Sequence, residues 1–375
     1  MAVIVLGVSM LHILTAKSIL DANEEADLVL FHPVHSPESR RMMRRWGVRL
    51  GYRKIIDLTD DVERAVANIR LGGRGLRGKF VGRRSQRLEF REVIEVLKGR
   101  LGVENCSYKK VILRFKVSLS EKILMAWCFP SIEMLRVPES IGEEIRDKRP
   151  LSMKVEWWVR IRLIDSKTQA SLFWLGVRPF GVPQILRLFS PRFTLNMGLS
   201  SRLKMDKTAL LRELGKVKIN KPLEKHVKVL IAGTLPLKKP NPILGWTASE
   251  ETQFYNDLIV HICVDQNVTR DEIVFVPHPR TRVQDLSEYK RNLSCSVIPQ
   301  TQDSSIELMI CHQKSIQAVY TYMSDSAASV KLLFGITGVF IDTSRLFKKH
   351  HYRMNKWRAE YCKLDILPVD RILKS

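Results

Sequence analysis

The chain has 375 residues, of which 45% are hydrophobic and 27% are charged. This balance is that of a soluble globular protein with room for two domains, and neither a low-complexity tract nor a solenoid repeat is present. The formal net charge of +23 predicts an anionic partner: nucleic acid, an anionic membrane face or an acidic substrate.

The first twenty residues are apolar, but they do not read as a signal peptide or a membrane span. No basic segment precedes them, and Ser9 and His12 interrupt the run well short of the roughly 20 residues that a span needs. We therefore expect a buried strand, a turn and a helix in a cytoplasmic protein. The six cysteines are scattered without a Cys-x-x-Cys pair, which argues against a disulfide framework or a zinc site.

In chain order, the first half alternates strand and helix patterns. Asp60 and Asp61 are placed to cap a helix that runs through Ile69. The segment Arg70–Arg100 then holds ten Lys or Arg and three Glu, and it fits either a solvated surface loop or an anion-binding one. The other expected elements are strands at 2–8, 27–31, 54–58, 110–117 and 155–164, and helices at 11–20, 37–46 and 88–101.

A domain boundary is expected near Lys204–Lys225, where the chain is polar and basic. Beyond it the strand and helix alternation restarts, and such alternation favours parallel α/β sheets. The expected strands are 226–232, 272–276, 294–298, 316–322 and 338–341, and the expected helices are 249–264, 304–311, 327–334 and 355–364. We predict an amino-terminal domain over 1–210, a carboxy-terminal domain over 211–350, and a helix in 351–375 that packs back on the first domain.

Ligands of open α/β sheets bind at the carboxyl ends of the strands, so the residues after each strand are candidates. Gly233 and Thr234 follow one strand, and a glycine there allows close backbone approach. His278 follows the next strand between Pro277 and Pro279, which fix the backbone around an imidazole that could protonate a leaving phosphate. A satisfied loop histidine is the alternative interpretation.

Glu307 lies in a short predicted helix, where it could accept the hydroxyls of a ribose or be an ordinary surface glutamate. Ser324, Ser326 and Ser329 stand where a strand gives way to a helix. The free N–H groups of such a helix start bind phosphate, and serine hydroxyls add donors. Simple capping by Ser324 or Asp325 is equally consistent with the pattern.

Together these features resemble the nucleotide-binding half of bacterial GT-B sialyltransferases, especially the polysialyltransferase and lipooligosaccharide sialyltransferase families. The segments that carry the resemblance are GTLP, EETQFYNDLIVHI, EIVFVPHPR, IPQTQDSSIELM and MSDSAASVKLLFG, and VIVLGVSMLHILTAKSIL is similar to the first strand and helix of the group. The match is good over about 225–335 and loose elsewhere. It implies an α/β fold of two Rossmann-like domains facing a cleft.

The resemblance also implies roles for individual residues. His278 would contact and protonate the phosphate of CMP-sialic acid, Ser324 with Ser326 or Ser329 would hold that phosphate, and Glu307 would bind the ribose. Gly233, Thr234 and Pro279 would lie beside the nucleotide. Ser9 would lie in the first-domain loop that faces the cleft.

The family's general base is an Asp in an acidic-Asp-Gly pattern after a strand of the first domain. Asp165 in LIDSKT is the matching position here, but Ser166 and Lys167 stand where the glycine is expected. A turn Asp at a strand end is the alternative interpretation. The resemblance implies metal independence, and no Asp-x-Asp motif lies near the predicted site.

The sequence therefore predicts an inverting sialyltransferase that acts on an anionic cell-surface glycan, with no cofactor. The basic segment could track that glycan or an anionic membrane face, such as the inner membrane. A GT-B transferase with another nucleotide-sugar donor, an inactive transferase fold and a basic nucleic-acid-binding protein are the alternatives. We do not expect nucleic acid as a partner, because no zinc-finger, RNP or KH pattern is present.

Overall fold

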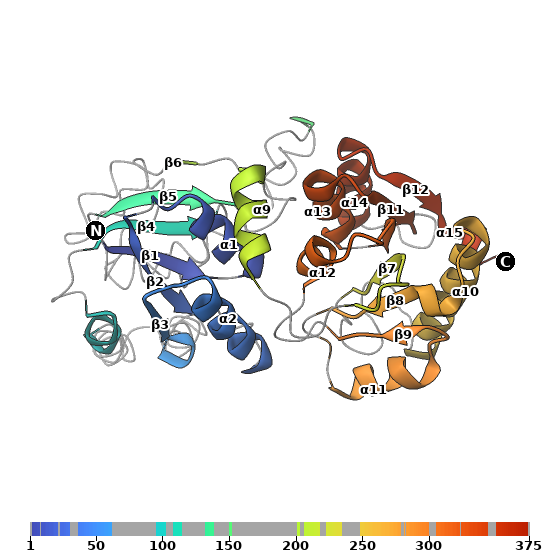
Figure 1. Cartoon of the computed structure of the whole chain (residues 1–375), viewed down its shortest axis with the longest axis horizontal. Helices are drawn as coiled ribbons and strands as arrows, with labels where there is room; N and C mark the ends of the chain where they lie inside the picture. Colours follow the sequence, from blue (N-terminus) through green and yellow to red (C-terminus); the bar gives the residue numbers. More distant parts are fainter. Residues whose placement is uncertain are drawn as a thin grey trace, which may run out of the picture. The chain divides into compact units, whose positions relative to one another are not determined.

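The computed structural model describes two compact α/β units, and the main boundary between them falls between Asp206 and Lys207 (Figure 1). That division lies four residues before the predicted boundary at 210. The described residues are 2–7, 9–21, 23–30, 37–61, 95–102, 108–114, 132–138, 150–151, 201–202, 206–217, 223–234, 248–278, 281, 283–299, 305–322, 324–343 and 350–373.

The first unit is built on a six-stranded parallel sheet with the strand order β3-β2-β1-β4-β5-β6. The central β1 is apolar on both faces and almost wholly buried, as a middle strand covered by helices on both sides must be. The elements are β1 (Ala2–Gly7), α1 (Met10–Ser18), β2 (Glu25–Leu30), α2 (Pro37–Arg49), β3 (Lys54–Asp57), β4 (Tyr108–Arg114), β5 (Glu133–Val137) and β6 (Ser201–Arg202).

The second unit repeats this plan with the order β12-β11-β10-β7-β8-β9, again all parallel. Its central strands β7, β8 and β10 are completely buried. Its elements are α9 (Lys207–Lys216), β7 (Val229–Ala232), α10 (Ala248–Asp265), η3 (Arg270–Glu272), β8 (Ile273–Val276), α11 (Val283–Asn292), β9 (Ser296–Val297), α12 (Ile306–His312), β10 (Ala318–Thr321), α13 (Ser326–Phe334), β11 (Thr337–Asp342), α14 (His350–Tyr361), β12 (Asp365–Pro368) and α15 (Val369–Ile372).

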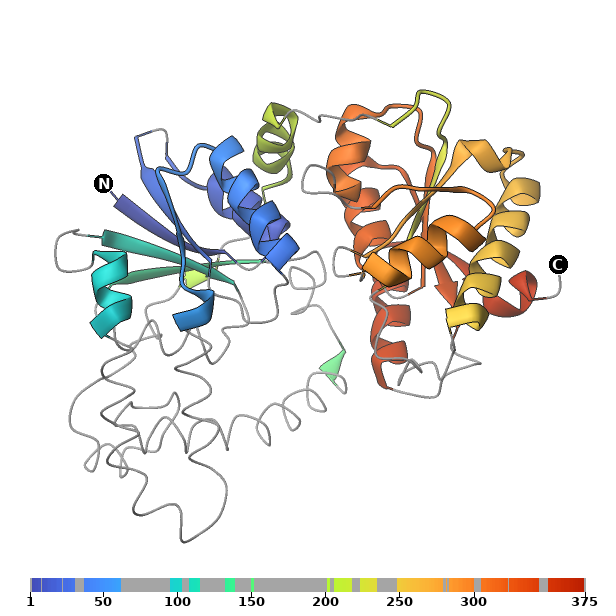
Figure 2. The same ribbon diagram turned by 90° about the horizontal axis from the view of Figure 1, so that it is seen from below.

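Two layers of helices cover the second sheet, as the turned view also shows (Figure 2). On one face, α10, α11 and α15 share a core with alternate strand residues such as Phe275 and Tyr320. On the other, α12 and α13 pack on the intervening strand residues, among them Val274 and Val319. In both units the strand order is that of a doubly wound Rossmann sheet. The predicted class, α/β with two Rossmann-like domains, is confirmed; how the domains face each other stays a prediction.

Several elements differ from the sequence-based expectation. The polar segment expected as a boundary contains α9, whose Leu210, Glu213 and Leu214 are buried at helical spacing and which contacts α12. Residues 351–375 do not form a helix alone, because β12 extends the second sheet and α15 follows it. The contacts of α14 with β11 and β12 lie within the second unit, and its predicted packing on the first domain stays a prediction. The predicted strand 155–164 lies outside the described residues.

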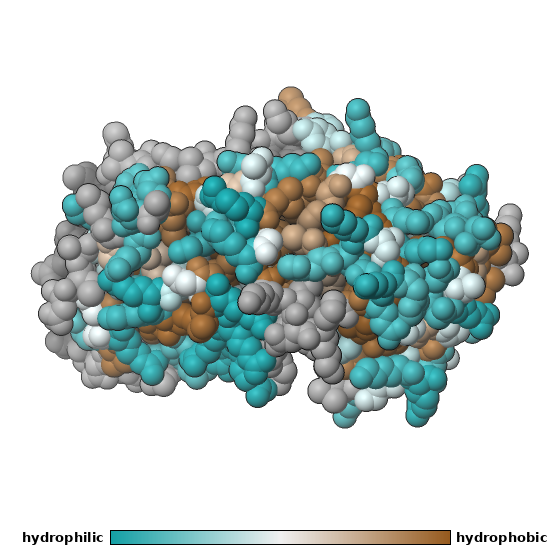
Figure 3. Space-filling view, in the orientation of Figure 1, coloured by the Kyte–Doolittle hydropathy of each residue, from teal (hydrophilic) through white to brown (hydrophobic). Residues whose placement is uncertain are grey.

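No described helix combines the length and apolar character that crossing a bilayer requires. The outer side of α2 is strongly basic, with Arg41, Arg44 and Arg45 exposed, and the visible surface over this helix is hydrophilic (Figure 3). Within the basic segment Arg70–Arg100, only residues 95–100 are described. There Lys98 pairs with Glu95 at 2.9 Å, and Arg100 pairs with Asp61.

Candidate functional site

The best-placed candidate site lies at the carboxyl edge of the second sheet, where the direction of winding reverses. The chain proceeds outward from β7 through β8 to β9, and then returns to the other side of β7 to form β10, β11 and β12. Ligands of doubly wound sheets bind at this switch point, here between the ends of β7 and β10. The residues that follow those two strands are Gly233 and Thr234 on one side, and Tyr322 to Ser326 on the other.

Gly233 is required by the packing at the end of β7. Its amide donates to the carbonyl of Val276 at 2.9 Å, which holds it against the end of β8. A Cβ atom on this residue would lie 2.8 Å from Cζ of Phe275 and 3.1 Å from Cα of Pro277. Gly233 therefore lets the loop after β7 pass close to β8, and its close approach to a ligand stays a prediction.

Thr234 is held by a buried group of polar side chains. Its Oγ1 lies 2.5 Å from the hydroxyl of Tyr322, which also donates to Oε1 of Glu251 at 3.2 Å. The amide of Thr234 donates to the hydroxyl of Tyr255 at 3.4 Å. Burial raises the pKa of both tyrosine hydroxyls well above 10, and the Glu251 charge adds to this effect, so both remain neutral hydrogen-bonding groups.

The serines before α13 form the second half of the site. The amide of Ser326 donates to Oγ of Ser324 at 3.2 Å, and the two hydroxyl oxygens lie 2.8 Å apart. Ser324, one position before the N-cap residue, thus accepts from the first N–H group of α13, and Ser324 and Ser326 both remain partly exposed at the helix start. This local hydrogen bond is compatible with a bound anion, and phosphate binding by the serines stays a prediction.

Asp325 occupies the N-cap position of α13, but its side chain makes no capping hydrogen bond. Its carboxylate is instead in an ion pair with Arg358 of α14. An unpaired aspartate here would repel a phosphate bound between the serines. The ion pair compensates that charge and also brings a guanidinium to the start of α13.

Glu307 and Ser329 are brought together by the contact between α12 and α13. Glu307 is partly exposed in the first turn of α12, and Ser329 is 2% exposed. Burial raises the pKa of the Glu307 carboxyl above 4.5, although hydrogen bonds with the hydroxyls of Ser305 and Ser329 act in the opposite direction. Ser329 is therefore a buried hydrogen-bond partner of the Glu307 carboxyl. Of the three predicted serines, Ser324 and Ser326 are the two that are partly exposed.

His278 stands two residues after β8, the strand next to β7, and is half-buried. Its carbonyl accepts a hydrogen bond from the amide of Thr281 at 2.8 Å, which turns the chain directly after the strand. Pro279 lies outside the described residues. Gly233, His278 and Ser324 thus follow three adjacent strands at one edge of the sheet, as the sequence predicts.

The first-domain candidates are less well defined. Ser9 follows β1, and its hydroxyl caps α1 by accepting from the amide of His12 at 3.1 Å. Asp165 lies outside the described residues, so its role as a base stays a prediction. Among the described residues there is no cluster of three His, Cys, Asp or Glu side chains suited to a metal ion, and metal independence also stays a prediction.

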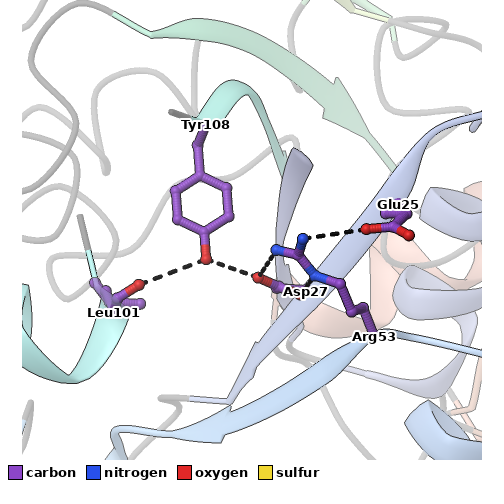
Figure 4. Close-up of polar contacts among 5 residues, drawn as sticks. All are labelled: Glu25, Asp27, Arg53, Leu101 and Tyr108. Carbon is purple, nitrogen blue, oxygen red and sulfur yellow. Dashed lines mark hydrogen bonds and ion pairs between the residues drawn. The ribbon is translucent and has the colours of Figure 1, made fainter. Parts of the chain in front are cut away.

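A second polar cluster, in the first unit, lies at the opposite edge of its sheet (Figure 4). Arg53 donates to both carboxylate oxygens of Asp27 at 2.9 and 2.7 Å and to Glu25 at 3.1 Å, while the Tyr108 hydroxyl donates to Asp27 at 2.7 Å. These residues join the starts of β2, β3 and β4. Because ligands bind at the carboxyl edge, this cluster is structural.

Glu251, Tyr322 and Arg358 belong to the site but are not among the residues predicted from the sequence. Glu251 was included only as part of a helix segment, and Tyr322 only as the end of a strand. A signal for Tyr322 is present in the sequence: Tyr320 and Tyr322 place two hydroxyl groups on one face of a buried strand. Because buried tyrosine hydroxyls need hydrogen-bond partners, this pattern indicates polar residues beside the strand. No sequence signal connects Arg358 with Asp325, since they are 33 positions apart and on different elements.

No protein-family model matches this chain, and no curated protein matches it by sequence. Among solved structures, a putative UDP-N-acetylglucosamine 2-epimerase from Listeria monocytogenes is 8% identical with a TM-score of 0.49, over 100% of this chain and 86% of that one. MnaA from S. aureus, in a co-structure with UDP, is 8% identical with a TM-score of 0.47, over 91% and 79% of the two chains.

A sialyltransferase from Photobacterium damselae, represented by its GT-B domain, is 9% identical with a TM-score of 0.43. The alignment covers 98% of this chain and 100% of that one. At these identities and TM-scores the likenesses carry no argument about substrate or reaction. The fold assignment rests on the strand orders of the two sheets.

Proposed function

We propose that this chain is a glycosyltransferase of the GT-B type that moves sialic acid from CMP-sialic acid to a glycan acceptor. The observation that carries the proposal is the meeting of Gly233–Thr234 with Ser324 and Ser326 at the switch point of the second sheet, with His278 after the adjacent strand. Such a site is suited to a nucleotide phosphate, because helix N–H groups and hydroxyls converge where the fold binds ligands.

In this proposal the donor phosphate lies at the start of α13. Ser324 and Ser326 donate their hydroxyl hydrogens to it, and Asp325 is tolerated because Arg358 compensates its charge. Glu307 accepts from the ribose hydroxyls, with Ser329 orienting its carboxylate. Thr234 lies against the nucleotide on the opposite side of the switch point.

The proposed reaction requires one group that acts on the leaving phosphate and one base. The acceptor hydroxyl attacks the anomeric carbon of sialic acid and inverts it, and the bond to the CMP phosphate oxygen breaks with its electron pair on that oxygen. His278 donates a proton or a hydrogen bond to the departing phosphate, which stabilises the charge that develops there. Asp165 takes the proton of the acceptor hydroxyl.

The positive charge of the protein supports an acidic acceptor. A net charge of +23 attracts polyanions, the exposed arginines of α2 offer a surface for them, and the sequence of residues 70–100 adds ten Lys or Arg. Neutralising Arg83, Arg84 and Arg87 together is expected to weaken binding to an acidic glycan or to anionic liposomes. Unchanged binding to both would show that this segment contacts neither.

Calorimetric titration with CMP, UMP and GMP tests the donor assignment. We expect CMP to bind most tightly and His278→Ala to weaken CMP binding. His226→Ala is the matched control, because His226 precedes β7 at the opposite edge of the same sheet, where it pairs with the exposed Glu224 at 3.5 Å and interacts with the charge of Asp271. Equal affinity for the three nucleotides would overturn the CMP assignment.

The main alternative is a GT-B transferase that uses another nucleotide-sugar. A clear preference for UMP or GMP in the same titration would favour it, and a donor screen by product formation would then identify the sugar. Salt-sensitive binding of RNA or DNA, without binding of any mononucleotide, would instead indicate a nucleic-acid-binding protein.

A further inference from the structure

We propose that Tyr322 is a positioning residue of the candidate site, and that its hydroxyl fixes the loop after β7 at a set distance from the serines before α13. This rests on the proposed function insofar as the two loops hold the nucleotide. The proposal concerns a side chain that does not itself touch the ligand. The proposal rests on two consecutive residues at the end of β10, Thr321 and Tyr322. Their side chains connect β10 to β7 and the loop after it, one on each face of the sheet.

On one face the connection is made by Thr321. Its hydroxyl donates to the carbonyl of Ala232, the last residue of β7, at 3.3 Å. The same oxygen accepts from the amide of Ser324 at 3.1 Å. Thr321 thus links the end of β7 directly to the first of the two serines.

On the other face the connection is made by Tyr322, since successive side chains of a strand point to opposite faces. Its hydroxyl has one hydrogen, which it donates to Glu251 at 3.2 Å. The 2.5 Å contact with Thr234 is then a bond that Thr234 donates. Tyr322 therefore fastens Thr234 to the first turn of α10, where Glu251 lies.

All three groups are removed from water: Tyr322 is 1% exposed, Glu251 is 7% exposed and Thr234 is 8% exposed. Buried polar groups that lose a partner are not compensated by solvent, so the arrangement has few alternatives. The ring of Tyr322 is also packed edge-on against Phe254, with centroids 5.7 Å apart. Removing only the hydroxyl leaves this packing in place and removes the hydrogen bonds of Tyr322 with Thr234 and Glu251.

The same strand supplies a matched control. Tyr320 is also 1% exposed, lies on the same face as Tyr322, and contacts the same helix through its hydroxyl. That hydroxyl donates to Asp265, the last residue of α10, at 3.4 Å, whereas Tyr322 reaches the first turn. The two tyrosines thus attach β10 to opposite ends of α10, and only Tyr322 lies beside the candidate site.

The experiment compares Tyr322→Phe with Tyr320→Phe in the full chain. Hydrogen exchange of peptides that contain Gly233 and Thr234 is measured without ligand, and CMP affinity is measured by calorimetry. We expect Tyr322→Phe to increase exchange of the Thr234 amide at least about tenfold and to weaken CMP binding about 5- to 20-fold. Tyr320→Phe should leave both values at the wild-type level, and urea unfolding of both variants measures how much global stability each one loses.

Thr234→Val provides the second variant, since it removes the partner oxygen while keeping a similar shape. If Tyr322 acts through Thr234, the double variant should bind CMP no more weakly than the weaker single variant. Equal exchange at Thr234 in the two tyrosine variants would overturn the positioning role, as would fully additive losses of affinity. A wild-type protein that binds no nucleotide would defeat the proposed function, and the exchange result would still decide whether Tyr322 holds Thr234.

Discussion

Arg358 of α14 is paired with Asp325, the residue that directly precedes α13. The side chains are 17% and 28% exposed, so the pair is partly shielded from solvent. It joins α14 to the serine pair, because Asp325 lies between Ser324 and Ser326 in the chain. The pair thereby turns an acidic position into one that can tolerate a neighbouring phosphate.

Arg358→Ala is therefore expected to weaken nucleotide binding. The substitution leaves the Asp325 carboxylate uncompensated next to the two serines, and repulsion between like charges about 4 Å apart costs about 1 kcal/mol when bulk water screens them fully, or at least about fivefold in affinity. Asp325→Asn in the same chain should restore most of the loss, because it removes the repelling charge. CMP titration at low salt measures both effects.

Lys356→Ala is the control for this experiment. Lys356 lies on the same helix and pairs at 3.4 Å with Asp342, which ends the neighbouring strand β11. It removes one positive charge from the same surface without exposing Asp325. If Lys356→Ala and Arg358→Ala weaken CMP binding equally, the effect is one of overall charge and the specific role of the Arg358 pair is wrong.

Glu307 gives the site a pH dependence. Burial raises the pKa of this carboxyl above 4.5, so in the free protein it takes up a proton at a higher pH than an exposed glutamate does. A ribose hydroxyl donates to the charged form. Nucleotide affinity should thus be full above the raised pKa and decline as the pH falls through it, a change that calorimetry between pH 8 and pH 4.5 would record.

Glu307→Gln removes the titrating carboxyl and therefore tests whether Glu307 causes the pH dependence. The variant should bind nucleotide more weakly at pH 8 and should lose less affinity than the wild type on acidification. The phosphate of the nucleotide also titrates at a pH of about 6, so the informative quantity is the difference between the two pH profiles. Parallel profiles would mean that Glu307 does not contact the ribose.

The regular parts of the second unit were predictable from the sequence because their periodicities are strong. The buried runs at β7, β8 and β10 contain no charged residue, and each ends at a glycine, a proline or a serine-rich turn. In parallel sheets these ends share one edge, so the grouping of Gly233, His278 and Ser324 followed from topology alone. The hydrogen-bond and ion-pair partners of these residues do not follow from topology.

What could not be predicted depends on contacts between distant elements. The segment LDILPVD near the carboxyl terminus has only four strand residues, and its identity as β12 is set by pairing with β11. Likewise, α9 begins directly after Asp206, and it is stabilised by the burial of Leu210 and Leu214 and by its contact with α12. The roles of Ser329 and Asp325 depend on side chains 22 and 33 positions away, Glu307 and Arg358.

Gly233→Ala should destabilise the second unit. Its Cβ would lie 2.8 Å from the Phe275 ring and 3.1 Å from the backbone of Pro277, and the backbone contact cannot be relieved by rotating a side chain. Overpacking of this kind costs about 1 to 3 kcal/mol. Urea unfolding followed by fluorescence measures the change.

Gly215→Ala in α9 is the matched control, because a Cβ there meets nothing within 4 Å. Alanine favours the helix over glycine by up to about 1 kcal/mol, so this variant should be neutral or more stable than the wild type. Equal stability of the Gly233→Ala variant and the wild type would show that the end of β7 moves freely away from β8.

Asp27→Asn is expected to destabilise the first unit at neutral pH, by about 2 kcal/mol, because the carboxylate receives charge-assisted hydrogen bonds from Arg53 and a third from Tyr108. Burial opposes the charged form, but these hydrogen bonds and the Arg53 charge outweigh it and lower the pKa below 3.8. A lowered pKa contributes stability that is complete above 3.8 and is lost as the pH falls through the folded-state value. Urea unfolding at pH 7, 5 and 3 measures this effect. The wild type should keep its advantage in stability over Asp27→Asn at pH 7 and pH 5, and should begin to lose it only at pH 3.

Glu25→Gln, which removes the exposed partner of Arg53, should change stability by less than about 0.5 kcal/mol at each pH. If the two variants were equally stable at pH 7, the buried carboxylate would contribute no more than a surface ion pair.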